Sequence, residues 1–230
     1  MGRAKRIALG GYLYHVINRS NGRRQMFDSA SDYEAFERVL WQASERFEMR
    51  ILSYCLMPNH WHLILWPRQD GDLSRFMAWL TLTHTQRWHA HRQSVGSGHV
   101  YQGRFKSFVV QSNEYFLTVC RYVERNALRA GLVERAEDWQ WGSLWRRVCG
   151  KREAQEILTD WPVAQPPNWL ALVNQEDSQG DKERELTTLR NCVMRGRPFG
   201  SEQWVKQIAG QLGLQSTMRP RGRPRKEKGS

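Results

Sequence analysis

Short runs of apolar and polar positions divide the first half of the chain into predicted strands and helices. β-Branched and aromatic runs are typical of strands, whereas apolar residues three or four positions apart are typical of one helix face. The helical pattern that begins at Ser29, for example, repeats through Tyr33, Phe36 and Phe47. On these criteria the predicted strands are 12–18, 50–57, 61–66 and 105–110, and the predicted helices are 29–48 and 73–91.

The order of these elements is strand, helix, strand, strand, helix, strand. This βαββαβ order predicts an α+β, ferredoxin-like fold, in which an antiparallel sheet carries both helices on one face. A further helix begins near Ser112. It places Tyr115 and Tyr122 seven residues apart, about two turns, and therefore on one face of that helix.

The chain divides into a main domain and a C-terminal appendage. The main domain is expected to span 1–150, with the Trp-rich stretch 139–145 folding back on it. The polar, proline-bearing stretch 151–182 predicts a linker. Helical patterns in 183–216 predict a short helical extension, and the basic run in 217–230 predicts a tail that is disordered on its own.

An excess of basic side chains indicates a polyanionic partner. The 230 residues include 35 Lys and Arg against 23 Asp and Glu, which leaves a net charge of +12. Nucleic acid is the leading candidate, since Lys and Arg side chains are attracted to its phosphates. No apolar run approaches the length of a membrane-spanning helix and the first residues lack the apolar core of a signal peptide. We therefore expect a cytoplasmic, nucleoid-associated protein with no membrane partner.

Two histidines bracket a large apolar residue in the sequence His60-Trp61-His62. Because residues two apart on a strand share a face, the two imidazoles would lie side by side while Trp61 packs on the opposite face. Imidazole is the commonest metal ligand, so the pair is a candidate two-point metal clamp, although it is not a complete ligand set. The alternative is a structural pair on a polar face.

These residues stand in a longer pattern. Met57-Pro58-Asn59 precedes the histidine pair, and about fifty residues later a tyrosine-bearing helix ends in the stretch RYVERNALRAGLV, which spans 121–133. The ordered combination resembles the single-tyrosine HUH transposases, and most closely the REP-associated tyrosine transposases (RAYTs). The resemblance covers roughly residues 8 to 150 and makes 1–150 the expected catalytic domain.

The resemblance implies a function and a set of site residues. It implies a single-stranded DNA endonuclease and strand transferase that acts on palindromic hairpins, with Mg²⁺ or Mn²⁺ held by His60 and His62. It also implies that Tyr115 is the nucleophile, which forms a covalent 5′-phosphotyrosine and leaves a free 3′ hydroxyl. Tyr122 is the alternative nucleophile on the same helix face.

Three further polar positions stay open at this point. Related transposases complete the metal site with a Gln one turn after the tyrosine, but the residue four beyond Tyr115 is Val119, which cannot coordinate a metal. Asn126 and Glu124 are candidate third ligands, with a local structural role as the alternative. His15 could neighbour the site across the sheet or be structural.

Other basic and imidazole side chains are candidates for contact with DNA. The repeated Arg-Gly-Arg-Pro sequence at 195–198 and 221–224 is similar to strips that enter the minor groove. Four histidines share no spacing, and we expect solvent-facing or phosphate-contacting positions for them: His84, His89, His91 and His99. The predicted DNA-binding residues are Arg19, Arg23, Arg24, Arg104, Lys106, Arg221, Arg223, Arg225 and Lys226.

Two other functional classes agree with the same charge and fold. One is a non-catalytic, ferredoxin-like nucleic-acid-binding or regulatory protein with a structural histidine pair. The other is a metal-dependent hydrolase that uses activated water and leaves no protein-linked DNA. For the transposase that the resemblance implies, the expected partner is single-stranded or hairpin DNA with REP-like palindromes. We expect a monomer, with a homodimer as the alternative.

Overall fold

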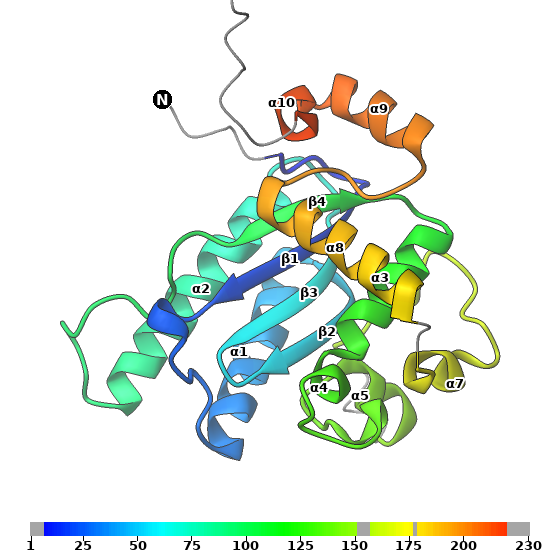
Figure 1. The fold of residues 1–230 in the computed structure, drawn as a ribbon. Coiled ribbons are helices and arrows are strands. Elements are labelled where there is room, and N and C mark those ends of the chain that lie inside the picture. Colours follow the sequence, from blue (N-terminus) through cyan, green and yellow to red (C-terminus); the bar gives the residue numbers. More distant parts are fainter. Residues whose placement is uncertain (1–6, 151–156, 177–178, 220–230) are drawn as a thin grey trace, which may run out of the picture.

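The fold is built around a four-stranded antiparallel sheet, seen in a computed structural model that describes residues 7–150, 157–176 and 179–219. The strands are β1 (Leu13–Arg19), β2 (Arg50–Met57), β3 (His60–Trp66) and β4 (Lys106–Val110). Their spatial order is β2-β3-β1-β4, so β3 and β1 lie at the centre of the sheet and β2 and β4 at its edges (Figure 1). This topology confirms the predicted ferredoxin-like α+β fold.

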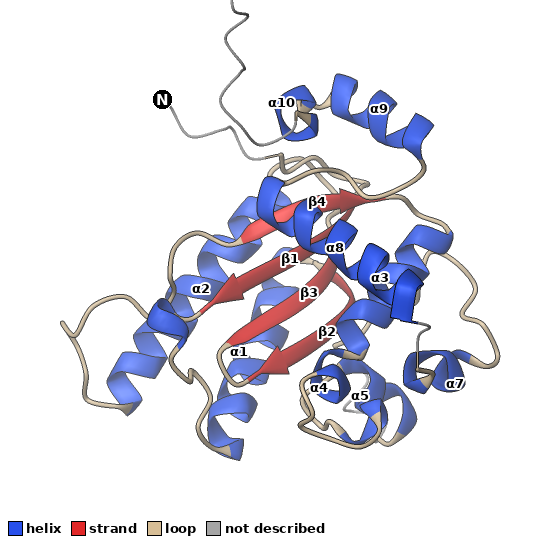
Figure 2. Ribbon diagram, in the orientation of Figure 1, coloured by secondary structure: helices blue, strands red, loops and turns tan. Residues whose placement is uncertain are grey.

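One face of the sheet is covered by the two long helices of the βαββαβ unit, α1 (Ala30–Phe47) and α2 (Asp72–His91). A capping box between Ser29 and Asp32 fixes the start of α1, since it satisfies backbone N–H groups that lack helical partners. The apolar face of α1, which includes Phe36 and Val39, is fully buried against the sheet. Both long helices lie behind the strands in Figure 2.

The opposite face carries the remaining helices that pack on the sheet (Figure 1). A second core, on this face, joins apolar residues of all four strands to Phe116 and Val119 of the helix that follows β4, and to Leu189 further along the chain. The helices described after β4 are α3 (Glu114–Glu124), α4 (Asn126–Arg129), α5 (Ser143–Val148), α7 (Trp169–Asn174), α8 (Gln179–Arg195), α9 (Glu202–Gln211) and α10 (Gln215–Met218). Short 3-10 turns occur at η1 (Asn21–Arg23) and η2 (Ala136–Asp138).

The Trp-rich stretch folds back onto the outer strand β2, as predicted. The backbone N–H of Leu56 donates to the carbonyl of Trp141 at 2.9 Å, and the indole N–H of Trp139 donates to the carbonyl of Leu56 at 2.8 Å. The stretch therefore covers the outer edge of β2, where backbone groups would otherwise lack partners within the sheet.

The stretch 151–182 was predicted to be a linker. In the part of it that the structure describes, the chain forms a helix that packs on the rest of the fold. Residues 169–174 form α7, and the indole of Trp169 is buried and donates to the Glu124 carboxylate at 2.8 Å. The prolines and polar residues mark the turns that lead into this helix, and its apolar residues supply the packing. The described part of this segment thus contributes Trp169 and Val173 to the second core rather than forming a spacer.

The C-terminal extension is attached to the outer edge of β4. Gly196 has φ of 69°, a left-handed conformation that favours glycine, and it turns the chain back after α8. Phe199 then donates its N–H to the carbonyl of Val109 at 2.8 Å and accepts from the N–H of Gln111 at 2.9 Å. Among the described residues, no helix is long and apolar enough to cross a membrane.

Candidate active site

The two imidazoles of the His60-Trp61-His62 sequence lie on the face of β3 that carries α3. Their ring centroids are 5.1 Å apart. Trp61 points to the other face, where it is fully buried and its indole N–H donates to the Tyr101 hydroxyl at 3.2 Å. The strand alternation therefore places the histidines as predicted, with both rings on the rim of one cavity.

Both imidazoles are held in the neutral form. Burial lowers the pKa of His60 to about 4, and the nearby Arg19 and Arg129 lower it further in the same direction. Burial also lowers the pKa of His62 well below its usual value, and the neighbouring His15 and His60 lower it further. A neutral imidazole carries a free lone pair, which is the form that coordinates a metal.

One nitrogen of each imidazole is already hydrogen-bonded. Nδ1 of His60 lies 2.7 Å from Oδ1 of Asn59, and Nδ1 of His62 lies 2.8 Å from Nε2 of His15. His15 sits on β1 directly beside β3, is fully buried, and stacks on His62 with centroids 5.0 Å apart. In each ring of the pair, Nε2 is the nitrogen left for a ligand in the cavity.

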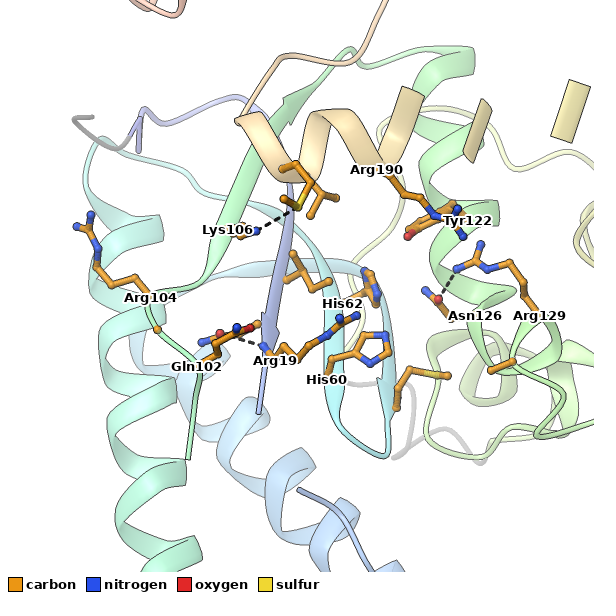
Figure 3. A pocket seen from close by; sticks show the side chains of 17 residues that line it. Arg19, His60, His62, Gln102, Arg104, Lys106, Tyr122, Asn126, Arg129 and Arg190 are labelled. Carbon is orange, nitrogen blue, oxygen red and sulfur yellow. Dashed lines mark hydrogen bonds between the residues drawn. The ribbon is translucent and has the colours of Figure 1, made fainter. Parts of the chain in front are cut away.

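Tyr122 stands beside this histidine cluster. Its ring centroid lies 5.6 Å from that of His62 and 6.0 Å from that of His15, in edge-on contact with both rings. The Arg129 guanidinium carbon lies 4.4 Å from the centre of the Tyr122 ring. Figure 3 shows the phenol facing the cavity, with Arg129 beside it.

Tyr115, the nucleophile expected from the resemblance, lies elsewhere. It does not line the cavity, and its ring packs edge-on against Phe199 with centroids 5.4 Å apart. The seven residues that separate it from Tyr122 advance the helix by about 10 Å. A shared helix face therefore does not bring both phenols to the histidines, and this geometry favours Tyr122 over Tyr115.

The choice of Tyr122 also changes the interpretation of the third ligand. The residue one turn later is then Asn126, which is buried and lines the cavity. Its amide oxygen accepts a hydrogen bond from Arg129 and keeps a second lone pair. Glu124 lies outside the cavity, where its carboxylate accepts from Trp169, Ser143 and Ser53 and burial raises its pKa.

The residues present fit a divalent ion with an incomplete protein ligand set. In the described part of the chain, no three His, Cys, Asp or Glu side chains gather as a metal site. His60, His62 and the Asn126 amide oxygen could hold Mg²⁺ or Mn²⁺ and leave coordination positions open for substrate oxygens. Open positions are what a catalytic ion needs.

The cavity has a volume of about 740 Å³ and is strongly basic. No carboxylate is among its described lining residues, so its positive charge has no internal counter-ion. The chemistry of the lining therefore favours an anion. Its cationic side chains, which come from β1, β4, α4, α8 and the loop before β4, are Arg19, Arg104, Lys106, Arg129 and Arg190 (Figure 3).

The predicted DNA-binding residues divide into three groups. Arg19, Arg104 and Lys106 line the cavity, whereas Arg23 and Arg24 lie exposed on and after the η1 turn and do not line it. The third group lies outside the described residues and comprises Arg221, Arg223, Arg225 and Lys226.

Two basic residues of the cavity, Arg129 and Arg190, are not among the predicted DNA-binding residues. Arg129 follows Asn126 by three residues and Tyr122 by seven, so helical spacing from Tyr122 could have found it. Arg190 lies far along the chain in α8, and no local pattern connects it to the histidines.

His84 does not occupy the solvent-facing position expected for it. The side chain is buried against Phe36, and its Nδ1 lies 2.7 Å from the Tyr101 hydroxyl. A histidine on an otherwise apolar helix face packs into the core when a partner for its polar atom lies there.

Comparison with protein families identifies the chain. The family described as "Transposase IS200 like" matches residues 9–126, just over half of the 230 residues. The chain belongs to this family. The matched region contains β1 to β4 and α3, and it ends at Asn126, so the IS200-like transposase match includes both histidines and Tyr122 but neither Arg129 nor α8.

Two similar proteins agree with the resemblance to RAYTs. A REP-associated tyrosine transposase of Haemophilus influenzae is 21% identical over 160 residues, which cover 66% of this chain and 87% of the relative. A solved structure described as a REP-associated tyrosine transposase bound to a REP hairpin has a TM-score of 0.54 and 18% identity. It covers 73% of this chain and 96% of its own, and it shows the same fold.

Proposed function

We propose that this IS200-like transposase cuts and rejoins single-stranded DNA beside a palindromic hairpin, with Tyr122 as the nucleophile. The observation that carries the proposal is the meeting of the Tyr122 phenol with His60 and His62 at one basic cavity. Tyr115 is replaced in this role because its ring packs against Phe199 away from the cavity.

The reaction exchanges one phosphodiester for another. The Tyr122 oxygen forms a bond to phosphorus as the bond from phosphorus to the 3′ oxygen breaks. The phenolic proton passes to solvent, and the departing 3′ oxygen takes a proton from solvent. The result is a 5′-phosphotyrosine and a free 3′ hydroxyl, and attack by that or another 3′ hydroxyl reverses the step.

The side chains around the phenol have separate tasks. Arg129 lies against the Tyr122 ring, where its positive charge can balance negative charge that develops on the phenolic oxygen and the phosphate. His60, His62 and Asn126 would hold Mg²⁺ or Mn²⁺, which supplies Lewis-acid polarisation of a phosphate oxygen when bound. Asn59 and His15 fix the two imidazoles through their Nδ1 atoms.

The basic lining supports single-stranded and hairpin DNA as the substrate. Arg19, Lys106 and Arg104 line the cavity, where they could contact a phosphate backbone. The solved relative is described as bound to a REP hairpin, and we extend that substrate class to this chain. The predicted monomeric state and nucleoid association belong to the same proposal.

A trapped protein-DNA adduct tests the proposal. Labelled single-stranded DNA that carries a palindromic hairpin from the host genome is incubated with the protein and Mn²⁺, then separated on a denaturing gel. We expect a slow adduct with the wild type and with Tyr115→Phe, and none with Tyr122→Phe, which should still bind the hairpin. An adduct that survives Tyr122→Phe and disappears in Tyr115→Phe would return the nucleophile to Tyr115.

The same gel separates the other functional classes. Cleavage without any adduct would indicate a hydrolase that uses water, and hairpin binding without cleavage would indicate a non-catalytic binding protein. Under the proposal, His60→Ala abolishes cleavage. If the histidine pair were purely structural, the folded His60→Ala variant would keep its activity on DNA.

A further inference from the structure

The helix α8 lies across the candidate active site although it is outside the region that defines the family. The family match ends at Asn126, whereas α8 spans Gln179–Arg195 and supplies Arg190, Val193 and Met194 to the cavity lining. Figure 3 shows Arg190 reaching from α8 toward Tyr122. One wall of the cavity is therefore built by the C-terminal extension.

This helix is anchored on both sides of Arg190. Leu189 and Cys192 are buried in the second core, and the chain after the helix pairs with the β4 edge through Phe199. The Lys106 ammonium of β4 lies 3.4 Å from the Met194 sulfur. The packing of neighbours on the same helix fixes the Arg190 backbone, while its side chain is exposed and faces the cavity.

Arg190 and Arg129 bring like charges toward one place. Both guanidiniums belong to the lining of the same cavity, Arg129 from α4 and Arg190 from α8 (Figure 3). No carboxylate lines the cavity among the described residues, so nothing in the lining offsets the repulsion between the two guanidiniums. An anion bound between them would be stabilised by both.

We propose that Arg190 binds a phosphate of the DNA strand beside the scissile one, so that the C-terminal extension completes the substrate site. The inference rests on the proposed function and deepens it, because it assigns a binding role to a segment outside the family region. A planar guanidinium can donate two parallel hydrogen bonds to one phosphate, which lysine cannot do. The ligand is thus a phosphodiester of single-stranded DNA that runs between α8 and Tyr122.

Binding measurements at several salt concentrations test this role. In a Tyr122→Phe background that prevents turnover, Arg190→Ala and Arg190→Lys are compared on two DNAs: a hairpin with a single-stranded flank, and the hairpin alone. We expect Arg190→Ala to weaken binding of the flanked DNA roughly tenfold. The slope of log affinity against log salt should fall in magnitude by about 0.7, the value for one phosphate contact on a single strand.

Three controls make the result specific. Arg190→Lys should retain the salt slope and lose part of the affinity, and the hairpin alone should bind Arg190→Ala as tightly as the parent. Arg38→Ala removes a positive, exposed side chain, 62% accessible, from α1 on the other face of the sheet, and should change neither quantity. Thermal unfolding confirms that each variant is folded.

Contrary results would be clear. Unchanged affinity and salt slope for the flanked DNA in Arg190→Ala would overturn the role, and so would equal weakening for both DNAs. In the protein that keeps Tyr122, faster cleavage by Arg190→Ala than by the wild type would show that α8 obstructs the site, and this result would also overturn the role. Failure of the wild type to form an adduct would instead count against the proposed function, since the binding assay does not depend on cleavage.

Discussion

His15 and His62 form a buried imidazole pair, with Nε2 of His15 2.8 Å from Nδ1 of His62. For His62 to offer Nε2 to a metal, its proton must be on Nδ1, and that proton needs an acceptor. His15 Nε2 is placed to accept it. The remaining His15 nitrogen, Nδ1, is buried with no partner in the described part of the protein. His15 is therefore a positioning residue for His62.

Replacing His15 should weaken metal binding, although His15 itself does not contact the metal. We expect His15→Phe, which keeps a ring of similar size against Phe108, to lower Mn²⁺ affinity about tenfold or more. His15→Gln keeps a hydrogen-bond acceptor and should lose less. Calorimetric titration with Mn²⁺ measures both. Equal affinity of wild type and folded His15→Phe would contradict the assignment.

Metal binding should stabilise the folded chain. At a Mn²⁺ concentration a hundred times its dissociation constant, the free energy of unfolding should rise by about 2.7 kcal/mol. The midpoint of thermal unfolding should then rise by about 5 °C or more, and chelation should remove the increase. His60→Ala should abolish the increase, whereas His99→Ala, an exposed histidine outside the active-site cavity, should preserve it. A similar increase in His60→Ala would place the ion elsewhere.

The buried Glu124 carboxylate joins three parts of the fold. It accepts hydrogen bonds from Trp169 of α7, Ser143 of α5 and Ser53 of β2, at 2.8, 2.8 and 3.2 Å. Glu124→Ala leaves these donors without an acceptor and opens a cavity, so the free energy of unfolding should fall by about 3 kcal/mol. Urea unfolding measures the change.

A surface glutamate provides the comparison for Glu124. Glu34→Ala breaks an exposed pair with Arg38 and should cost less than about 1 kcal/mol. If the two substitutions cost the same, the Glu124 network contributes no more than an exposed ion pair.

His84 should make stability depend on acidity. Burial lowers the pKa of His84 to about 3, against an unfolded value near 6.5. The unfolded chain therefore binds a proton that the folded chain does not, and stability falls as pH drops below 6.5. Between pH 7 and pH 5 this one group should cost about 2 kcal/mol of unfolding free energy.

Substitution of His84 isolates its share of the pH dependence. His84→Gln keeps an acceptor for the Tyr101 hydroxyl and cannot be protonated. Its loss of stability between the two pH values, measured by chemical denaturation, should be smaller than that of the wild type by about that amount. An unchanged loss would show that other groups carry the whole effect.

The sequence predicted the sheet well because alternation is a local property. His60, Trp61 and His62 show it directly, since the imidazoles and the indole occupy opposite faces of β3. The order of strands and helices then leaves few arrangements, and the ferredoxin-like one was predicted correctly.

The choice between the two tyrosines was not decided by local pattern. Helical spacing identifies the face that Tyr115 and Tyr122 share, but it does not tell which turn of α3 lies beside β3. That depends on how α3 packs along the sheet, through contacts between residues far apart in the chain. The spacing to Asn126, four residues after Tyr122, was the available clue.

Arg190 and Trp169 show a second limit. Each is brought into place by tertiary packing between segments far apart in the chain, which a local sequence pattern does not predict. The polar and proline-bearing composition of 151–182 is typical of a linker, and it gives no sign that one indole inside it reaches a buried carboxylate.

The pairing of Phe199 with the rim of β4 has a consequence for self-association. Exposed strand edges invite a neighbouring molecule to add its own strand, and proteins commonly shield them. Here the returning chain takes up the N–H of Gln111 and the carbonyl of Val109. A second copy of the chain could add a strand to this edge of the sheet only after that segment had been displaced.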